Sequence, residues 1–533
     1  MFRYIFRKLH SLHLIKQNNA FAAEQENKKN KRNENQKTGL LSLNLDQNLE
    51  YIERVLGKNY DFTKRLITLG KQNELRLALV FLSGMTDIQV INNNIIKPLV
   101  EHSEGRKSED PLDIKTIKAK LLTVNELTLS SYFEDVFKGY FNGDSILLMD
   151  GSDQALIIQT RHWETRGIEE PDTETIIRGP RAGFIEDFQT NTTLLRRILK
   201  SKYFVVETMV LGQESNTTVG IAYLSNIADP LLIQEVKERL QRIKIDAILE
   251  SGYIEQFIED APTSIFSTVA NSEKPNDVAG KIIEGRVAIL IDGSPMVLTV
   301  PMVFIESFQS AEDYYSRPYY ASVIRMLRFV AFAISILLPG SYVALLTFHQ
   351  ELIPTNLLFS IAREESGVPF PSFVDMLLMG LIFEILREAG IRLPRPVGQA
   401  ISIVGALVIG QSAVSAGLVG APVVILVSLT AVSSFVVPPQ TDTGALLRLL
   451  FVILGGVMGG IGILFGLLSV FIHISSLRSF GTPYFSPFSP TVFRDLKDTL
   501  VRVPLPSMRT RPDSLDSQNF QREKGREKKY GRK

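Results

Sequence analysis

Two copies of an Asp-Gly-Ser tripeptide are the first residues in this sequence whose types and spacing could do chemistry. Asp150 precedes Ser152 and Asp292 precedes Ser294, so each carboxylate could act as the base of a neighbouring nucleophile. No histidine recurs with either copy, and each copy lies between two apolar runs. Such an Asp-Gly pair is typical of a β-hairpin turn, because glycine tolerates the positive φ that the turn needs. We therefore predict turns rather than a catalytic site, and no enzymatic activity.

A second group of charged residues lies where charge is costly. The apolar segment 373–389 carries Asp375, Glu384, Arg387 and Glu388. A charge at the centre of a bilayer costs at least a few kcal/mol. This segment is therefore expected to face a protein interior, a water-filled path or the membrane interface, and its four charges are candidate buried membrane charges.

The segment 397–418 mixes glutamine, serine and glycine with apolar residues. Helix packing through small residues explains this pattern, and a water-lined path is the sharper alternative. Helical spacing then puts four candidate pore-lining residues on one face: Val404, Val408, Gln411 and Ser415. A ring of valines, repeated by an oligomer, could close such a path by dewetting.

The composition excludes several classes of protein. The 533 residues contain no cysteine, which excludes disulfides, thiolate catalysis and cysteine-ligated zinc, and we predict no cofactor or metal. Residues 1–40 hold 9 Lys and Arg against 3 Asp and Glu, and residues 507–533 hold 9 against 4. We predict a basic disordered tail over 1–40 and a cytoplasmic basic tail over 476–533.

The region 41–320 contains an internal duplication. The run 77–87 (LALVFLSGMTD) resembles 219–229 (VGIAYLSNIAD), and the two Asp-Gly-Ser turns repeat at the same offset of 142 positions. Two matches at one offset predict a cytoplasmic soluble domain of two related α/β units, over 61–200 and 201–320.

An all-α polytopic membrane domain is predicted to follow over 321–475. A membrane helix takes about 20 apolar residues, which four segments provide: 329–348, 397–418, 419–437 and 449–474. Basic residues flank the first and the last of them, which places both ends of the domain in the cytoplasm and requires an even number of crossings. We expect four, with 373–389 re-entrant or interfacial. The rival prediction is six, with a break at Pro339-Gly340 dividing a longer first region.

Five stretches of the sequence carry a resemblance to a known family. They are EEPDTETIIRGPRAGFIED (169–187), ESFQSAEDYY (306–315), REAGIRLPRPVGQAISIVGALVIGQSAVSAGLV (387–419), SSFVVPP (433–439) and FGTPYFSPFSP (480–490). In these stretches the chain resembles the A subunits of spore germinant receptors, from about residue 40 to 500. One departure is Ala182, where the family pattern leads us to expect Glu.

The resemblance implies a function and partners. Such a subunit would work with a transporter-like B subunit and a C lipoprotein in the inner spore membrane, with its soluble domain and tails on the core side. It would form a homo-oligomeric gated ion path that opens in nutrient-triggered germination, in contact with lipid and without nucleic acid. Two alternatives stay open: a non-conducting scaffold that relays the signal between the B and C subunits, or a related subfamily acting later in germination.

Overall fold

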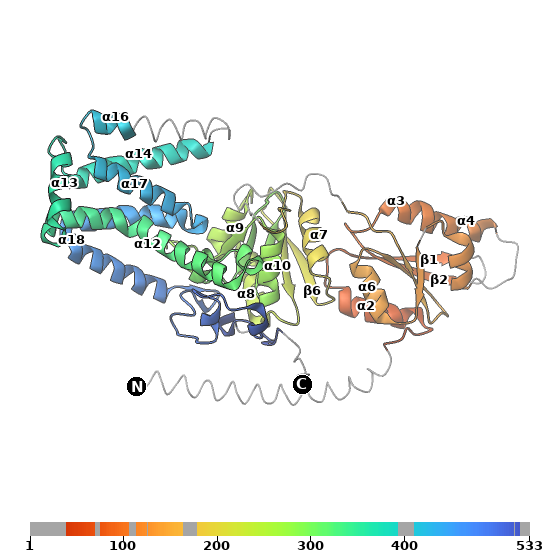
Figure 1. Ribbon diagram of the computed structural model, residues 1–533. Coiled ribbons are helices and arrows are strands. Elements are labelled where there is room, and N and C mark those ends of the chain that lie inside the picture. The colour runs from red at the N-terminus through yellow and green to blue at the C-terminus, as the bar shows by residue number, and fades with distance from the viewer. Residues whose placement is uncertain are drawn as a thin grey trace. The chain divides into compact units, whose positions relative to one another are not determined.

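The computed structural model describes residues 39–69, 75–105, 113–124, 126–163, 178–392, 410–515 and 517–522. The predicted tail over 1–40 therefore lies almost wholly outside the described residues. The chain divides into two compact units, one built around a first β-sheet and a larger one that contains most of a second sheet and the C-terminal half of the chain (Figure 1).

The first sheet has five antiparallel strands in the order β1-β2-β4-β5-β3. The strands are β1 Phe62–Leu69, β2 Leu75–Leu82, β3 Leu127–Ser130, β4 Ser145–Met149 and β5 Ala155–Ile158. Its helices are α2 Leu45–Leu56, α3 Ile88–Val90, α4 Lys97–Gly105, α5 Ile114–Thr116 and α6 Phe133–Phe141, with the π-helical turns Ile91–Ile96 and Ile117–Leu121.

Both faces of this sheet are covered, as the alternation of its side chains shows. Ala78 and Val80 of β2 pack with α2 and α6 in one apolar cluster. The alternate residues Leu77 and Leu79 pack in a second cluster, with the helical segment that contains Ile95. Successive strand residues point to opposite faces, so a central strand buried on both sides is apolar throughout.

The second sheet repeats the first. Its strands are β6 Phe204–Leu211, β7 Thr217–Leu224, β8 Ala270–Ser272, β9 Val287–Ile291 and β10 Val297–Val300, in the order β6-β7-β9-β10-β8. Its helices are α7 Phe188–Ile198, α8 Pro230–Arg242, α9 Ser251–Ile258 and α10 Pro275–Glu284. Strand for strand, this is the order of the first sheet, in agreement with the repeat in the sequence. The unit boundaries at 61, 200 and 320 stay predictions.

The Asp-Gly-Ser tripeptides form the turns between β4 and β5 and between β9 and β10. Gly151 and Gly293 have φ of 79° and 85°, as such turns require. Each aspartate also accepts a hydrogen bond from the start of a helix distant in sequence. Asp150 Oδ1 accepts from Leu45 N at 3.1 Å in α2, and Asp292 Oδ1 accepts from Phe188 N at 3.3 Å in α7. Each copy of the repeated tripeptide thus forms a turn and also binds the start of a helix.

The helical region begins after a 3₁₀ turn, Phe304–Phe308, and the short helix α11, Glu312–Tyr315. It contains α12 Pro318–Phe348, α13 Thr355–Glu365, α14 Ser372–Arg392, α16 Gly410–Ser415, α17 Ala421–Ser434 and α18 Thr441–Ser476. Among the described residues, Pro318–Phe348 and Pro438–Ser476 are long and apolar enough to cross a membrane. Helix α12 continues through Pro339, so the break on which the six-crossing prediction rested is absent.

Helix α18 is a hairpin of two arms rather than one span over 449–474. Gly459 has φ 61° and ψ −143°, which are not helical angles. A methyl group placed on Gly466 would lie 2.8 Å from the Phe451 ring, whereas these residues would be about 22 Å apart along a straight helix. The sequence missed this fold-back because the apolar run is continuous across the turn.

Both ends of the hairpin return to one loop of the larger unit. Thr443 Oγ1 donates to Ile265 O at 2.7 Å, and His473 Nε2 lies 2.9 Å from Ser264 Oγ. At the other end, the turn at Gly459 and Gly460 lies against Phe348 and His349, where α12 ends. Helix α12 and the two arms therefore run side by side (Figure 1).

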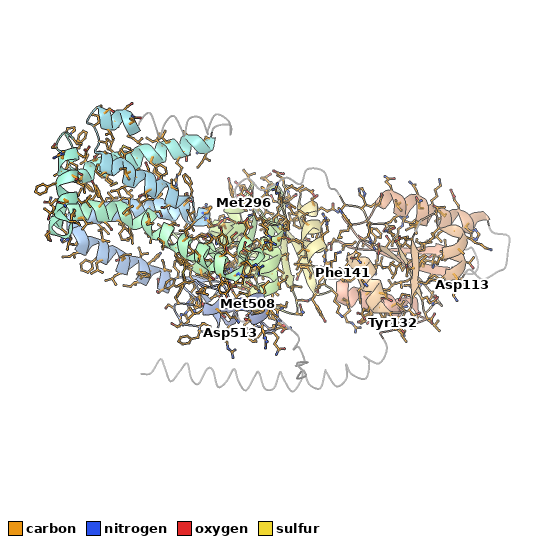
Figure 2. The ribbon with its side chains drawn as sticks, in the orientation of Figure 1. Asp113, Tyr132, Phe141, Met296, Met508 and Asp513 are labelled. Atoms are coloured by element: carbon orange, nitrogen blue, oxygen red, sulfur yellow. The ribbon has the colours of Figure 1, made fainter. Side chains whose placement is uncertain are left out.

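The segment after α18 is folded, which the prediction of a tail over 476–533 did not anticipate. Residues 477–522 carry the strands β11 Arg478–Ser479 and β12 Thr482–Pro483 and several 3₁₀ turns. Tyr484, Arg502, Met508 and Arg511 are buried in it, and Figure 2 labels Met508 and Asp513 of this segment. Its arginines look solvated in the sequence, but Arg511, for example, donates to the carbonyl oxygens of Ile283, Asn519 and Gln521.

Candidate functional site at the base of the helices

Four of the five stretches that resemble the germinant receptor family meet where the second sheet joins the helices. Phe304 N, two residues before the stretch 306–315, donates to Tyr484 O of the stretch 480–490 at 2.8 Å. Gln440 Nε2 donates to Ser307 Oγ at 2.8 Å just after 433–439, and Arg178 N donates to Glu312 Oε1 at 3.0 Å. Because segments this far apart in sequence converge here, we treat this junction as the candidate functional site.

Aromatic rings form the apolar half of the junction. Phe308 stacks on Phe329 of α12 with ring centroids 4.0 Å apart. Phe304 meets Tyr484 edge to face at 6.0 Å, and Val437 and Phe451 belong to the same buried cluster. Burial of aromatic rings stabilises such contacts strongly, so the sheet, α12, α18 and the C-terminal segment share one core.

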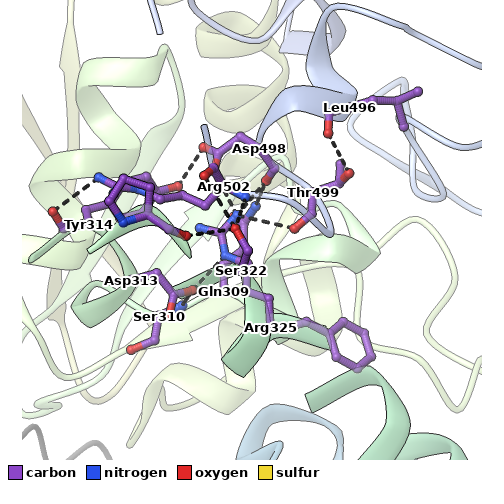
Figure 3. A network of polar contacts seen from close by, with 12 residues as sticks. Gln309, Ser310, Asp313, Tyr314, Ser322, Arg325, Leu496, Asp498, Thr499 and Arg502 are labelled. Atoms are coloured by element: carbon purple, nitrogen blue, oxygen red, sulfur yellow. Dashed lines mark hydrogen bonds and ion pairs between the residues drawn. The ribbon is translucent and has the colours of Figure 1, made fainter. Parts of the chain in front are cut away.

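Arg325 of α12 is the centre of the polar half (Figure 3). Its side chain is 0% exposed. Its Nε donates to Asp313 Oδ2 at 2.7 Å, and its Nη1 donates to Asp498 Oδ1 at 2.7 Å. The carbonyl oxygens of Asp498 and Thr499 also accept from Nη1. One guanidinium of the helix therefore ties together the end of the sheet domain and the C-terminal segment.

A second layer of contacts surrounds this arginine. Arg328, one turn further on, donates to both oxygens of Asp313 at 3.0 and 2.9 Å. Tyr314 donates to Asp498 Oδ2 at 2.8 Å, and Arg502 lies over the Tyr314 ring with its Cζ 5.6 Å from the centroid. Two arginines of the helix thus share two carboxylates, and the aspartates are held from several sides.

Burial changes the acidity of the groups in this network. It raises the pKa of Asp498 above its ordinary value, although the charge and hydrogen bonds of Arg325 oppose the shift. Burial, together with the negative charge of Asp498, also raises the pKa of Tyr314. The tyrosine therefore stays a hydrogen-bond donor at neutral pH, which suits its bond to the Asp498 carboxylate.

A small cavity adjoins the network. Its volume is about 60 Å³, and Glu306, Tyr314, Lys497, Asp498 and Met508 are among its lining residues. This is room for a few water molecules rather than for a nutrient. Among the described residues, no group of three or more His, Asp or Glu side chains is placed to hold a metal ion.

The candidate pore-lining residues lie elsewhere. Val404 and Val408 fall outside the described residues. Gln411 and Ser415 lie in α16, and both are exposed in the single chain. The arrangement of the four as one face stays a prediction.

The candidate buried membrane charges do not form one cluster. Asp375 is 2% exposed, and its Oδ2 accepts from Gly420 N at 3.0 Å. Glu384 binds Arg387 at 2.8 Å. Glu388 is paired with Arg392 on the exposed side of α14, at 2.5 Å. Asp375 and the Glu384–Arg387 pair thus lie at two heights on the side of the segment 373–389 that faces other helices, whereas Glu388 lies on its exposed side.

Sequence reasoning missed two charged residues that lie near these charges, one of like sign and one of opposite sign. Glu365 of α13 accepts from Tyr342 Oη at 3.0 Å and from Ser372 Oγ, in the neighbourhood of Asp375. Arg448 of α18 lies 3.3 Å from Glu384. The charge pattern within 373–389 could not reveal Glu365 or Arg448, because both residues belong to other helices.

The fold and the junction define a class of protein: a duplicated α/β domain whose second sheet is joined by a buried polar network to long apolar helices. The model of the family "Bacillus/Clostridium GerA spore germination protein" matches residues 50–514. The chain belongs to this family.

Individual relatives agree with the family match. The chain is 43% identical to spore germination protein KA of Bacillus subtilis (strain 168), over 91% of this chain and 89% of that protein. It is 38% identical to the uncharacterized membrane protein YfkQ of the same organism, over 91% and 94%. Among solved structures, it is similar to the N-terminal domain of the A subunit of the Bacillus megaterium spore germinant receptor GerK3, with 31% identity and a TM-score of 0.40, over 50% of this chain and 97% of that one.

Proposed function

We propose that the chain is the A subunit of a spore germinant receptor and takes part in nutrient-triggered germination in the inner spore membrane. Membership of the GerA family and the relatives that are spore germination proteins support this role. No enzymatic role is part of the proposal. The expected partners are the B subunit, the C lipoprotein and further copies of this chain, which together would form a gated ion path.

The buried junction is the observation that carries the proposed mechanism. Arg325 lies near the start of α12, seven residues after Pro318, and is bound by carboxylates from both sides of the junction. A movement of the sheet domain or of the C-terminal segment would have to move α12 or break a fully buried ion pair. Breaking such a pair costs about 3–5 kcal/mol, so rigid transmission to the helices is favoured.

The order of the helices supports six crossings in place of the expected four. Helix α12 and the first arm of α18 run away from the junction, and the second arm returns to it. Helix α14 begins against the hairpin turn, with Phe373 beside Gly456, and its Glu384 reaches Arg448 closer to the junction. Helix α17 runs the same way, from Gly420 beside Asp375 to the stretch before Gln440. These directions put Arg392 and Gly420 on opposite sides, so we propose that 373–389 spans rather than re-enters and that the crossings total six.

The absence of cysteine allows a direct test of this topology. Single cysteines replace Asn356, which is exposed beyond the end of α12, and Gln518, which is exposed in the C-terminal segment. We expect an impermeant thiol reagent to label Asn356→Cys and not Gln518→Cys in membranes of intact cells. Labelling of both, or of Gln518→Cys alone, would contradict the proposed orientation.

The gate is tested at the predicted valine ring. Val408→Ala should widen the path, so that the purified chain conducts in planar bilayers without a stimulus and spores germinate without nutrient. The matched control is Val432→Ala in α17, where the side chain is 66% exposed on the outside of the helices. If both variants respond to nutrient normally at normal receptor levels, Val408 is not the gate. The hypothesis of a non-conducting scaffold would then be favoured.

A further inference from the structure

Two arginines of the helical region share a single carboxylate. Arg387 Nη2 lies 2.8 Å from Glu384 Oε2, and Arg448 Nη2 lies 3.3 Å from Glu384 Oε1. The guanidinium of Arg448 also lies over the Phe383 ring, 5.6 Å from its centroid. Arginine stays charged in proteins, so this group carries one positive charge that its glutamate does not neutralise.

The hydrogen bonds of this group are also incomplete. The Nε and Nη1 atoms of Arg387, and the Nε and Nη2 atoms of Arg448, donate no hydrogen bond to any residue within the described ranges. The two side chains are only 15% and 9% exposed, so water replaces few of these bonds. Buried donors of a charged group that make no hydrogen bond are costly, so the described residues leave this group incompletely satisfied.

The position of the group indicates what kind of acceptor could complete it. Arg448 lies seven residues after the start of α18 at Thr441, about 10 Å along the helix, and Thr443 is bonded to the loop at Ile265. The group is therefore on the side of the membrane that faces the second sheet. The same two helices carry exposed apolar side chains at this level, Ile385 of α14 and Leu449 of α18.

We propose that Arg387 and Arg448 bind the phosphate of an anionic phospholipid in the leaflet on the side of the sheet domain. A phosphate offers several oxygens to the two guanidinium groups, which it would approach through the exposed 15% and 9% of the side chains. Basic pockets between membrane helices on the cytoplasmic side bind such headgroups, and exposed apolar side chains such as Ile385 would lie along the acyl chains. The inference rests on the proposed membrane location of the chain and not on ion conduction.

The test uses the purified full-length chain in a neutral detergent, with added phosphatidylglycerol or phosphatidylcholine. Bound lipid is counted by native mass spectrometry, and the shift of the thermal unfolding midpoint gives the apparent affinity. We expect phosphatidylglycerol alone to bind and stabilise the wild type. Arg387→Gln and Arg448→Gln should each weaken its affinity by about tenfold, the loss expected for one charged contact of about 1.4 kcal/mol.

Two variants make the result specific to this site. Arg392→Gln changes an exposed arginine of the same helix and should bind phosphatidylglycerol as the wild type does. Glu384→Gln removes the carboxylate that competes for both guanidinium groups and should bind the lipid more tightly. A merely structural ion pair would instead lose stability in Glu384→Gln with no gain in lipid affinity.

Several outcomes would overturn the proposal. Equal binding of the two lipids, or an unchanged affinity in both arginine variants, would show that Arg387 and Arg448 do not form a phospholipid site. Stabilisation by inorganic phosphate alone, as strong as that by phosphatidylglycerol, would mean a free anion rather than a lipid. Disulfide crosslinking of two chains through the single cysteine of Leu449→Cys, at the exposed neighbour of Arg448, would mean that a second copy supplies the acceptor. Each outcome is distinct from failure of the ion path, because no current is measured.

Discussion

The two buried arginine groups of the larger unit differ in how completely the chain itself satisfies them. Arg325 has two carboxylates and two carbonyl oxygens, and only its Nη2 lacks a hydrogen bond to the described residues. Arg387 and Arg448 share one carboxylate, and four of their nitrogen atoms make no hydrogen bond to the described residues, although Arg448 Nη2 is in ion-pair contact with Glu384. Both groups lie between helices that the chain brings together from distant segments.

The difference indicates two kinds of site. A buried cation whose own chain supplies all its counter-charge holds parts of a fold together, because removing it strands its partners. A buried cation with too few partners gains little from its own chain and depends on something that binds. The junction is therefore a structural joint, and the group around Glu384 is a binding site.

Replacing Arg325 should produce the largest effect. Arg325→Ala leaves Asp313 and Asp498 buried without their main partner, and we expect a loss of about 3–5 kcal/mol in the free energy of unfolding. Denaturant unfolding of the detergent-solubilised chain measures this. Arg392→Ala, at an exposed pair, should change the free energy by about 0.5 kcal/mol or less. Equal stability of the two variants would remove the distinction between joint and surface.

The close packing that holds both groups in place comes next in size. Gly455→Ala would overlap the carbonyl oxygen of Gly340 where α12 and the first arm of α18 touch. Overpacking of this kind costs about 1–3 kcal/mol. Gly380→Ala in α14 is the control, since no atom lies within 4 Å of its added methyl group, and it should be neutral or stabilising. A neutral Gly455→Ala would show that the helices are not packed this closely.

Replacing Arg448 should affect stability much less than replacing Arg325. Arg448→Met keeps the volume and leaves Glu384 paired with Arg387, so we expect a change within about 1 kcal/mol of the wild type in lipid-free detergent. Thermal unfolding without added lipid measures it. A loss as large as that of Arg325→Ala would show that the two groups are equivalent.

The smallest effect is a dependence on pH at the junction. Because burial raises the pKa of Asp498, its protonated form favours the folded state. The resulting stability is fully present below the unfolded pKa of about 3.9 and is lost as the pH rises through the raised folded value. The difference in unfolding free energy between wild type and Asp498→Asn should therefore shrink over that range. A difference that grows with pH would reverse the sign of the shift.

Local signals in the sequence were sufficient for the sheets and their turns. The Asp-Gly pairs at 150 and 292 predicted hairpins because turn chemistry depends on adjacent residues. Their bonds to the starts of α2 and α7 could not be predicted, since the partners lie more than 100 positions away. The family resemblance identified the stretches that converge on the junction, but not that they converge.

The helical region was harder to predict from the sequence, because its contacts also join residues that are distant in the chain. Hydropathy measures composition along the chain, and a turn at Gly459 leaves the apolar run unbroken, so two arms looked like one helix. Arg448 is a single charge in that run, and only the packing of α14 against α18 shows that it faces Glu384. The sequence singled out the charges of 373–389, and their role in the membrane stays a prediction, whereas the residues that contact them could be found only in the fold.

The hairpin of α18 also gives the helical region two long arms that are anchored at the same end. Each arm is about 26 Å long, and both are anchored at one loop, at Ser264 and Ile265. A tilt of about 5° at that loop would displace the turn at Gly459 by roughly 2 Å over such a length. Since Phe348 and His349 rest on that turn, such a tilt would also displace the far end of α12.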